Sequence, residues 1–323
     1  MNIEPVDRCD VVVLVDNVTD ILSSIPDSIT GEVANVFKAG AKELSGSCLC
    51  CAHWGLSLVI TAERGAAMRT LLFDSGPEGG TVERNGGRLG IDFSTIDAAM
   101  FSHGHWDHVG GMVQALELIH EARGGGTIPV HVNAGMFVRR GIKTPDGAVI
   151  PFADVPDRAA LEWAGGEVVF TESGGSLLDG MFAISCEIPR VTPYEKGLPP
   201  HVKDIGVGWE PDPWIMDERY AAVHVRDKGI IVFTACSHAG VVNVLKHARE
   251  TFDPVPLYGV MGGFHLSGAC EAVIPETVED LKAFDLQMIV PGHCTGWRAI
   301  HKLVEAFGEE RVVPSAVGRT HRF

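Results

Sequence analysis

The chain has 323 residues, 46% of them hydrophobic and 38 of them glycine, which is long enough to bury a large core. Its 42 acidic residues against 26 basic ones give a net charge of −16, and no basic block interrupts this excess. Such a field repels polyanions, so the composition argues against a nucleic-acid partner and favours a small-molecule substrate.

The eight cysteines do not form a disulfide pattern. Three cluster at Cys48, Cys50 and Cys51, and the others are scattered through apolar segments or stand beside histidines. This distribution is typical of reduced thiols. The N-terminal segment lacks a secretory core and no hydrophobic run approaches membrane-spanning length, so we expect a cytoplasmic protein with no membrane partner.

The first element with a chemical group at its end is an apolar run from Thr70 to Phe73, which ends in Asp74 before a Ser-Gly turn. The run predicts a buried strand. A carboxylate at the end of a strand is a common turn residue, and by itself it indicates no more than that.

The most informative motif is FSHGHWDHVGG at 101–111, in which His103, His105, Asp107 and His108 lie within six residues. An alternating extended segment would place the first two histidines on one side, and the following turn would bring the other two groups beside them. Imidazole and carboxylate ligands suit zinc, and also manganese or iron. The motif predicts two divalent metal ions in one pocket, zinc before manganese or iron, followed by a helix over residues 112–122.

A strand is predicted within the segment Ile128–Ala134, which contains His131 and Asn133. Strand alternation places these two side chains on one face, so either could approach the metals or support a ligand. A neutral amide is a poor metal ligand, which disfavours the asparagine. The following region, about 141–217, is rich in proline and glycine and is expected to be a loop-rich insertion.

Three later apolar runs, at 230–240, 260–266 and 287–296, each end in small residues and a histidine. These histidines are His238, His265 and His293, and Cys236 precedes the first of them. Functional groups of α/β proteins commonly lie at strand ends, so we expect all three histidines in the site. The thiol is either a metal ligand or a small buried residue.

The HxHxDH run resembles the signature of the metallo-β-lactamase superfamily. Further motifs resemble the branch similar to 7,8-dihydropterin-6-methyl-4-(β-D-ribofuranosyl)aminobenzene 5′-phosphate synthase: 15–17, 55–57, 72–76, 89–92, 236–240, 262–266 and 291–296. The resemblance implies an α/β fold, the αββα sandwich, with two mixed sheets flanked by helices. It also implies that Asp74 supports a ligand without touching metal. Because the expected ligands span 103–293 with no linker between them, we expect one domain over 1–323.

Two ligands of the wider superfamily pattern are missing. Asn133 stands about where a histidine is usual, and Cys236 or His238 lies in the region of the usual bridging aspartate. We therefore expect two groups of ligands. One ion is assigned to His103, His105 and His238. The other ion is assigned to Asp107, His108 and His293.

The leading functional hypothesis is a hydrolase that uses a metal-bound hydroxide on an ester, lactone, amide or phosphoester bond. In this hypothesis Asp107 orients the hydroxide, and His265 is a proton donor or oxyanion partner. The substrate is a small molecule, which could be phosphorylated or pterin-like. Cations for a phosphate are available at Arg139, Arg140, Lys143, Arg190, Lys196 and Arg298.

Three alternatives remain open. The branch resemblance implies a transferase that joins a pterin methyl diphosphate to an aryl amine, with Trp54, Trp106 and Trp297 available for stacking. A pair of irons would indicate a redox protein. The third alternative is a noncatalytic metal-dependent binding module. The oligomeric state is left open by the sequence.

Overall fold

The computed structural model describes Met1 and residues 3–323. Its largest sheet has eight strands in the order β2-β18-β1-β3-β4-β5-β6-β9. Antiparallel pairs from β18 to β4 continue into parallel pairs from β4 to β9, so this sheet is mixed. The strands are β1 (Arg8–Val15), β2 (Ile29–Thr30), β3 (Ser57–Arg64), β4 (Ala67–Phe73), β5 (Ala98–Met100), β6 (Ile128–Val132), β9 (Gly166–Phe170) and β18 (Thr320–Arg322).

The second sheet has six strands in the order β10-β11-β14-β15-β16-β17 and is also mixed. Its last three strands are parallel neighbours, so their carboxyl ends lie side by side at one edge. The strands are β10 (Gly175–Leu177), β11 (Phe182–Ile184), β14 (Ala221–Val225), β15 (Gly229–Thr234), β16 (Leu257–Gly263) and β17 (Met288–Gly292).

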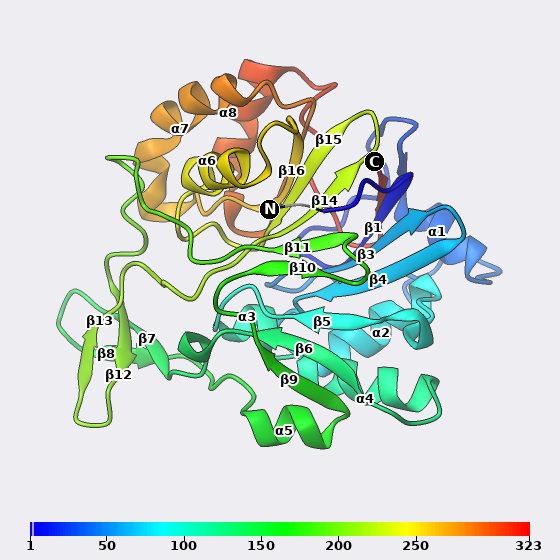
Figure 1. Ribbon diagram of the computed structural model, residues 1–323, viewed down its shortest axis with the longest axis horizontal. Coiled ribbons are helices and arrows are strands. Elements are labelled where there is room, and N and C mark those ends of the chain that lie inside the picture. Colours follow the sequence, from blue (N-terminus) through cyan, green and yellow to red (C-terminus); the bar gives the residue numbers. More distant parts are fainter. Residues whose placement is uncertain (2) are drawn as a thin grey trace.

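Helices cover the outer face of each large sheet, with α6, α7 and α8 on the second sheet and α1, α2, α4 and α5 on the first (Figure 1). The α-helices are α1 (Glu32–Lys38), α2 (Gly79–Leu89), α3 (Trp106–Val109), α4 (Met112–Ala122), α5 (Arg158–Trp163), α6 (Val241–Phe252), α7 (Ile274–Leu281) and α8 (Trp297–Phe307). Short 3-10 helices span Phe93–Thr95, Ala134–Met136, Gly268–Val273, Lys282–Phe284 and His293–Thr295.

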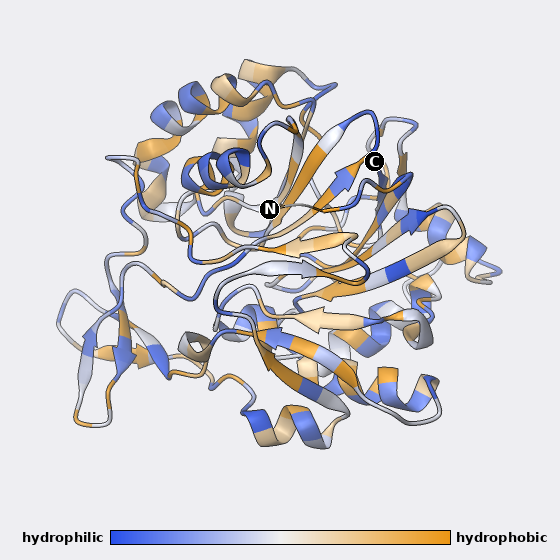
Figure 2. Cartoon of the chain, in the orientation of Figure 1, coloured by the Kyte–Doolittle hydropathy of each residue, from blue (hydrophilic) through white to orange (hydrophobic). Residues whose placement is uncertain are grey.

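The core lies in three layers, because alternate residues of a strand point to opposite faces of a sheet. Phe233 of β15 packs between the two large sheets, whereas its neighbour Val232 packs against the helices outside. In β4, Phe73 faces the inner layer and Leu72 the outer helices. Figure 2 shows the resulting concentration of hydrophobic residues in the strands of both sheets. The predicted αββα sandwich of two mixed sheets is confirmed.

A third, four-stranded antiparallel sheet has the order β13-β12-β7-β8 and projects at one side of the sandwich (Figure 1). It lies within the region expected to be loop-rich. The expected division into one domain with an insertion at 141–217 stays a prediction. Among the described residues, no helix is long and apolar enough to cross a membrane. The strands are β7 (Arg140–Lys143), β8 (Val149–Pro151), β12 (His201–Asp204) and β13 (Trp209–Pro211).

Candidate metal centre

The site lies where strands of both large sheets end. Asp74 directly follows β4 and His293 directly follows β17, while Ser237 lies three residues beyond the end of β15 and His265 two residues beyond the end of β16. All four have a left-handed backbone, with φ between 45° and 57°. For residues other than glycine this conformation costs about 1–2 kcal/mol, and it persists where the surrounding structure fixes it, commonly at functional sites.

The HxHxDH motif does not form the extended segment that alternation predicted, and that prediction is wrong. Residues 102–104 form bends, the N–H of His105 donates to the carbonyl of His103 at 3.1 Å, and the short helix α3 carries Asp107 and His108. A Cβ on Gly104 would lie 2.2 Å from the carbonyl oxygen of Met136, so only glycine allows this close approach of the two backbones.

Two groups of possible ligands lie side by side in this site. His103, His105 and His238 form one, and Asp107, His108 and His293 form the other. Within each group the ligand atoms lie within 4.8 Å of one another. All six side chains are buried. These are the same two groups of three that the sequence suggested.

Asp74 fixes the protonation of a histidine in each group. Its Oδ2 accepts hydrogen bonds from the Ser102 hydroxyl at 2.6 Å and from His108 Nδ1 at 2.8 Å. Because the Ser102 proton is given to Asp74, Ser102 Oγ accepts from His103 Nδ1 at 2.9 Å. When their rings are neutral, as metal ligation requires, both histidines therefore carry their proton on Nδ1 and leave Nε2 for a metal.

His201 fixes the protonation of His105 in the same way. His201 Nδ1 lies 2.9 Å from the carbonyl oxygen of Asp212, which can only accept, so this nitrogen is the protonated one. Burial lowers the pKa of His201 to about 4, so the ring is neutral. Its Nε2 then accepts from His105 Nε2 at 2.9 Å, which leaves His105 Nδ1, 3.0 Å from His103 Nε2, as the unprotonated ligand atom. His201 was not predicted from the sequence, because a lone histidine in a Pro- and Gly-rich region forms no motif.

Two buried carboxylates hold the backbone of the site. Asp217 accepts from the N–H of Gly104 at 2.9 Å and forms an ion pair with Arg140, a buried residue of the third sheet. Glu218 accepts from the N–H groups of His238 and the following residue, both at 2.7 Å. The short segment between β13 and β14 therefore positions both the HxHxDH turn and the turn after β15.

Several imidazole nitrogens of the site lack the hydrogen-bond partners that a metal-free site would need. Both ring nitrogens of His238 and of His293 are buried without a hydrogen-bond partner. Burial, together with neighbouring imidazoles, lowers the pKa of His103 and His238 well below its ordinary value, so these rings are neutral and have a free lone pair. A buried polar atom without a partner costs about 1–3 kcal/mol, and metal ligation would remove that cost.

Cys236 lies between the two groups of ligands. With His103 and His108, one residue from each group, it forms a further possible metal-binding group, and its Sγ lies 3.3 Å from His108 Nε2. Its other neighbour is Cys294, with 3.2 Å between the two sulfurs. All eight cysteines are free. Cys294, which directly follows His293, was not among the residues predicted for the site.

The structure does not bring His131 and Asn133 into the clustered groups. His131 Nδ1 lies 2.9 Å from Thr171 Oγ1, and the side chain of Asn133 accepts from the N–H of Gly135 at 2.9 Å. Each side chain therefore has a local partner.

The basic residues expected near the pocket are mostly engaged elsewhere. Arg140 pairs with buried acids, Arg190 donates to backbone carbonyls, and Arg298 pairs with Glu271. Lys196 differs from these arginines, because it lines a pocket that also contains histidines of the site.

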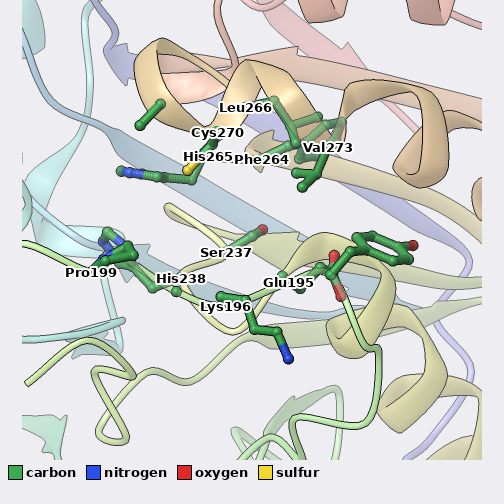
Figure 3. Close-up of a pocket in the computed structure, with 14 residues that line it drawn as sticks. Glu195, Lys196, Pro199, Ser237, His238, Phe264, His265, Leu266, Cys270 and Val273 are labelled. Carbon is green, nitrogen blue, oxygen red and sulfur yellow. The ribbon is translucent and has the colours of Figure 1, made fainter.

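Two pockets meet at the site. One, of about 230 Å³, is lined by Trp54, Trp106 and Phe152 together with ligands of both groups. The other, of about 220 Å³, has an apolar wall and extends from the site toward α6. His238 and His265 line both pockets. Figure 3 shows these two histidines at one end of the second pocket, with Glu195 and Val273 at the other end.

Comparison with known proteins agrees with this geometry. No family model matches the chain. It is 28% identical over 257 residues to 7,8-dihydropterin-6-methyl-4-(beta-D-ribofuranosyl)-aminobenzene-5'-phosphate synthase of Methanocaldococcus jannaschii. The aligned residues cover 79% of this chain and 85% of that protein. It is also 28% identical over 237 residues to an uncharacterized protein of the same organism, which covers 73% of this chain and 82% of the relative.

Solved structures share the fold at lower identity. Tm1679, a metal-dependent hydrolase of the beta-lactamase superfamily, superimposes with a TM-score of 0.71 at 20% identity, over 97% of this chain and 98% of that one. The metallo-beta-lactamase fold protein YhfI from Bacillus subtilis gives a TM-score of 0.51 at 13% identity, over 98% of this chain and 100% of that one. The chain therefore has the metallo-β-lactamase fold, and its sequence is similar to that of the dihydropterin-methyl-aminobenzene-ribofuranosyl-phosphate synthase from Methanocaldococcus jannaschii.

Proposed function

We propose that the chain is a metal-dependent hydrolase that binds two divalent ions and acts on an ester, lactone, amide or phosphoester bond of a small metabolite. The observation that carries this proposal is the pair of ligand groups, in which both ring nitrogens of His238 and of His293 are buried with no hydrogen-bond partner. Two divalent ions held there would lower the pKa of a bound water from about 15.7 toward about 7 and would polarise a carbonyl or phosphoryl oxygen.

Asp107 supplies the one carboxylate of the two groups. Its Oδ2 lies 3.4 Å from His293 Nε2 and 3.9 Å from His108 Nε2. Burial raises the pKa of Asp107, but the two imidazoles outweigh this and lower the pKa below its ordinary value, so the group is ionised. A carboxylate in this position can hold a metal and accept a hydrogen bond from the attacking water, which is the orienting role that we propose for it.

The pocket around Trp54, Trp106 and Phe152 restricts the substrate. These side chains offer apolar faces beside the ligands, and they favour a substrate with a flat, aromatic or hydrophobic part. Lys196 lies in the second pocket and is a candidate for contact with a negative group on the same substrate. His265 lines both pockets, and its expected role as proton donor stays a prediction.

The same aromatic pocket favours a second candidate function. The relative from Methanocaldococcus jannaschii is named as a synthase of a dihydropterin-methyl-aminobenzene compound. A pterin could stack on Trp54 or Trp106, and the metal ligands beside them could hold a diphosphate leaving group. We therefore propose a transferase of this type as the alternative to hydrolysis. Trp297 does not contribute to this pocket, because it lines a separate groove with Arg298.

The first test is elemental analysis of purified, unchelated protein by plasma mass spectrometry. We expect zinc, or manganese, in the wild type, and we expect the His103→Ala, His293→Ala double variant to lack both ions of the two groups. The control is His131→Ala, whose side chain lies outside the clustered groups. A double variant that holds as much metal as the wild type would refute the proposal, whereas iron in the wild type would favour the redox alternative.

A second test separates hydrolase from transferase. A dihydropterin methyl diphosphate is incubated with the metal-loaded protein, with and without an aryl amine, and diphosphate release is measured. Release without the amine, giving the hydroxymethyl product, supports a hydrolase. Release only with the amine supports the transferase. A parallel panel of aryl esters, lactones and phosphoesters reports hydrolysis of other bonds, and ligand binding with no turnover anywhere would indicate a binding module.

A further inference from the structure

We propose that Cys236, His265 and Cys294 form a third metal position, which takes a thiophilic ion such as Zn²⁺ separately from the two ions of the histidine and aspartate groups. These three side chains place an Sγ, a ring nitrogen and a second Sγ within 4.8 Å of one another. Cys294 and His265 belong to neither of the two groups described above.

The donor set is typical of a thiophilic ion. Two thiolates and an imidazole, with a fourth position left open, are a ligand set found for zinc, and thiolate ligands also suit Cu⁺. Both sulfurs are buried, and the residues carrying them are each about 3% exposed. With only 3.2 Å between them, the sulfurs are close enough to share one ion. A ring nitrogen of His265 lies within 4.8 Å of both sulfurs, so the three donors surround one position.

The backbone holds the three donors rigidly. They follow β15, β16 and β17, which are parallel neighbours in one sheet, so the donors are positioned by adjacent strand ends. His265 has φ of 45°, a strained conformation that directs its side chain from the end of β16. A Cβ on Gly263 would lie 2.7 Å from Cys294 Sγ, so glycine leaves the room that the sulfur occupies.

A dithiol without metal is the simplest alternative. Cys294 Sγ can donate to Cys236 Sγ, and that hydrogen bond accounts for both sulfurs. It leaves His265 Nδ1 buried with no hydrogen-bond partner. A metal ion engages all three groups and displaces the two thiol protons.

The third position would also contact the substrate. Cys236, His265 and Cys294 all line the pocket that contains Trp54 and Trp106. The open coordination position could therefore take an oxygen or sulfur donor of a ligand bound there. In this arrangement His265 has its lone pair on a metal and cannot be the proton donor, so the two roles of His265 exclude each other.

The test is a titration of metal-free, reduced protein with Co²⁺, followed by visible and near-ultraviolet absorption. Thiolate ligation gives an intense sulfur-to-cobalt charge-transfer band, which histidine and carboxylate ligands do not give. Cys236 could also contribute such a band from its place between His103 and His108, so the decisive variant is Cys294→Ser. Its matched control is Cys48→Ser, which removes a half-buried cysteine outside the clustered groups.

We expect Cys294→Ser to bind one equivalent of Co²⁺ less than the wild type and to lose intensity in the charge-transfer band, while Cys48→Ser behaves as the wild type. We also expect the His103→Ala, His293→Ala variant to retain one equivalent that shows the band. Equal stoichiometry and equal spectra in Cys294→Ser and wild type would overturn the proposal. A wild type that binds only this one equivalent would instead contradict the proposed two-metal function, so the two failures are distinguishable.

Discussion

Replacing Asp74 with asparagine changes only one atom but should weaken metal binding without any loss of a ligand. The carboxylate accepts three hydrogen bonds, from the Ser102 N–H at 2.7 Å, from the Ser102 hydroxyl at 2.6 Å and from His108 Nδ1 at 2.8 Å. An amide has one acceptor oxygen, and its NH2 group would face a donor. Where the NH2 group faces His108, the ring relieves that clash by moving its proton to Nε2, the nitrogen that faces the metal; where the amide is flipped, the NH2 group faces the Ser102 N–H instead.

The expected loss is about 10- to 100-fold in metal affinity, or about 1.4–2.7 kcal/mol, which is the usual effect of removing a hydrogen-bond partner from a ligating histidine. Zinc affinity is measured by competition with a chromophoric chelator. The control is Asp97→Asn, because Asp97 also accepts from a backbone N–H, that of Thr70 at 2.9 Å, but at the start of β5, the end of that strand away from Ser102. An Asp74→Asn protein that folds and binds zinc with wild-type affinity would refute the tautomer argument.

Three further predictions follow from the same contacts. Glu218→Gln should weaken metal binding about 10-fold in chelator competition, because an amide cannot accept from both N–H groups that position His238. His201→Phe should have a similar effect by leaving the Nε2 proton of His105 without an acceptor, whereas His131→Phe should not. Burial lowers the pKa of His321 to about 3, so the unfolded chain binds this proton below about pH 6.5 and the folded chain does not. The free energy of unfolding of the metal-free protein, measured with urea, should therefore decrease as the pH falls from 6.5 to 5. This decrease should be about 2 kcal/mol smaller in His321→Leu than in the wild type. Equal decreases in the two proteins would contradict the prediction.

The parts of the fold that the sequence predicted are those with a long, regular apolar pattern. The helix expected over 112–122 is α4, Met112–Ala122, and the strand expected within Ile128–Ala134 is β6, Ile128–Val132. The third sheet was not foreseen, because its strands have three or four residues and stand among prolines and glycines. Strands this short show too little alternation to be distinguished from a loop, and they are formed by pairing across distant segments.

The candidate site divides in the same way. His103, Asp107 and their neighbours form a local motif, and a local motif can be recognised from spacing alone. Residues that act through one long-range contact carry no such signal. His201 meets His105 across 96 positions of sequence, and Glu218 meets the turn after β15 across 20. Only the folded chain reveals that these residues belong to the site.

The third sheet therefore contributes residues that position the ligands of the metal centre. His201 of β12 sets which nitrogen of His105 is free, and Arg140 of β7 donates to the carbonyl oxygen of Gly104 at 3.1 Å while pairing with Asp217. These contacts involve the third sheet, whereas Asp74, at the end of β4 in the first sheet, supports the same histidine turn through Ser102. Because supporting partners typically contribute 10- to 100-fold in metal affinity, changes in this sheet should tune the metal centre without altering any ligand.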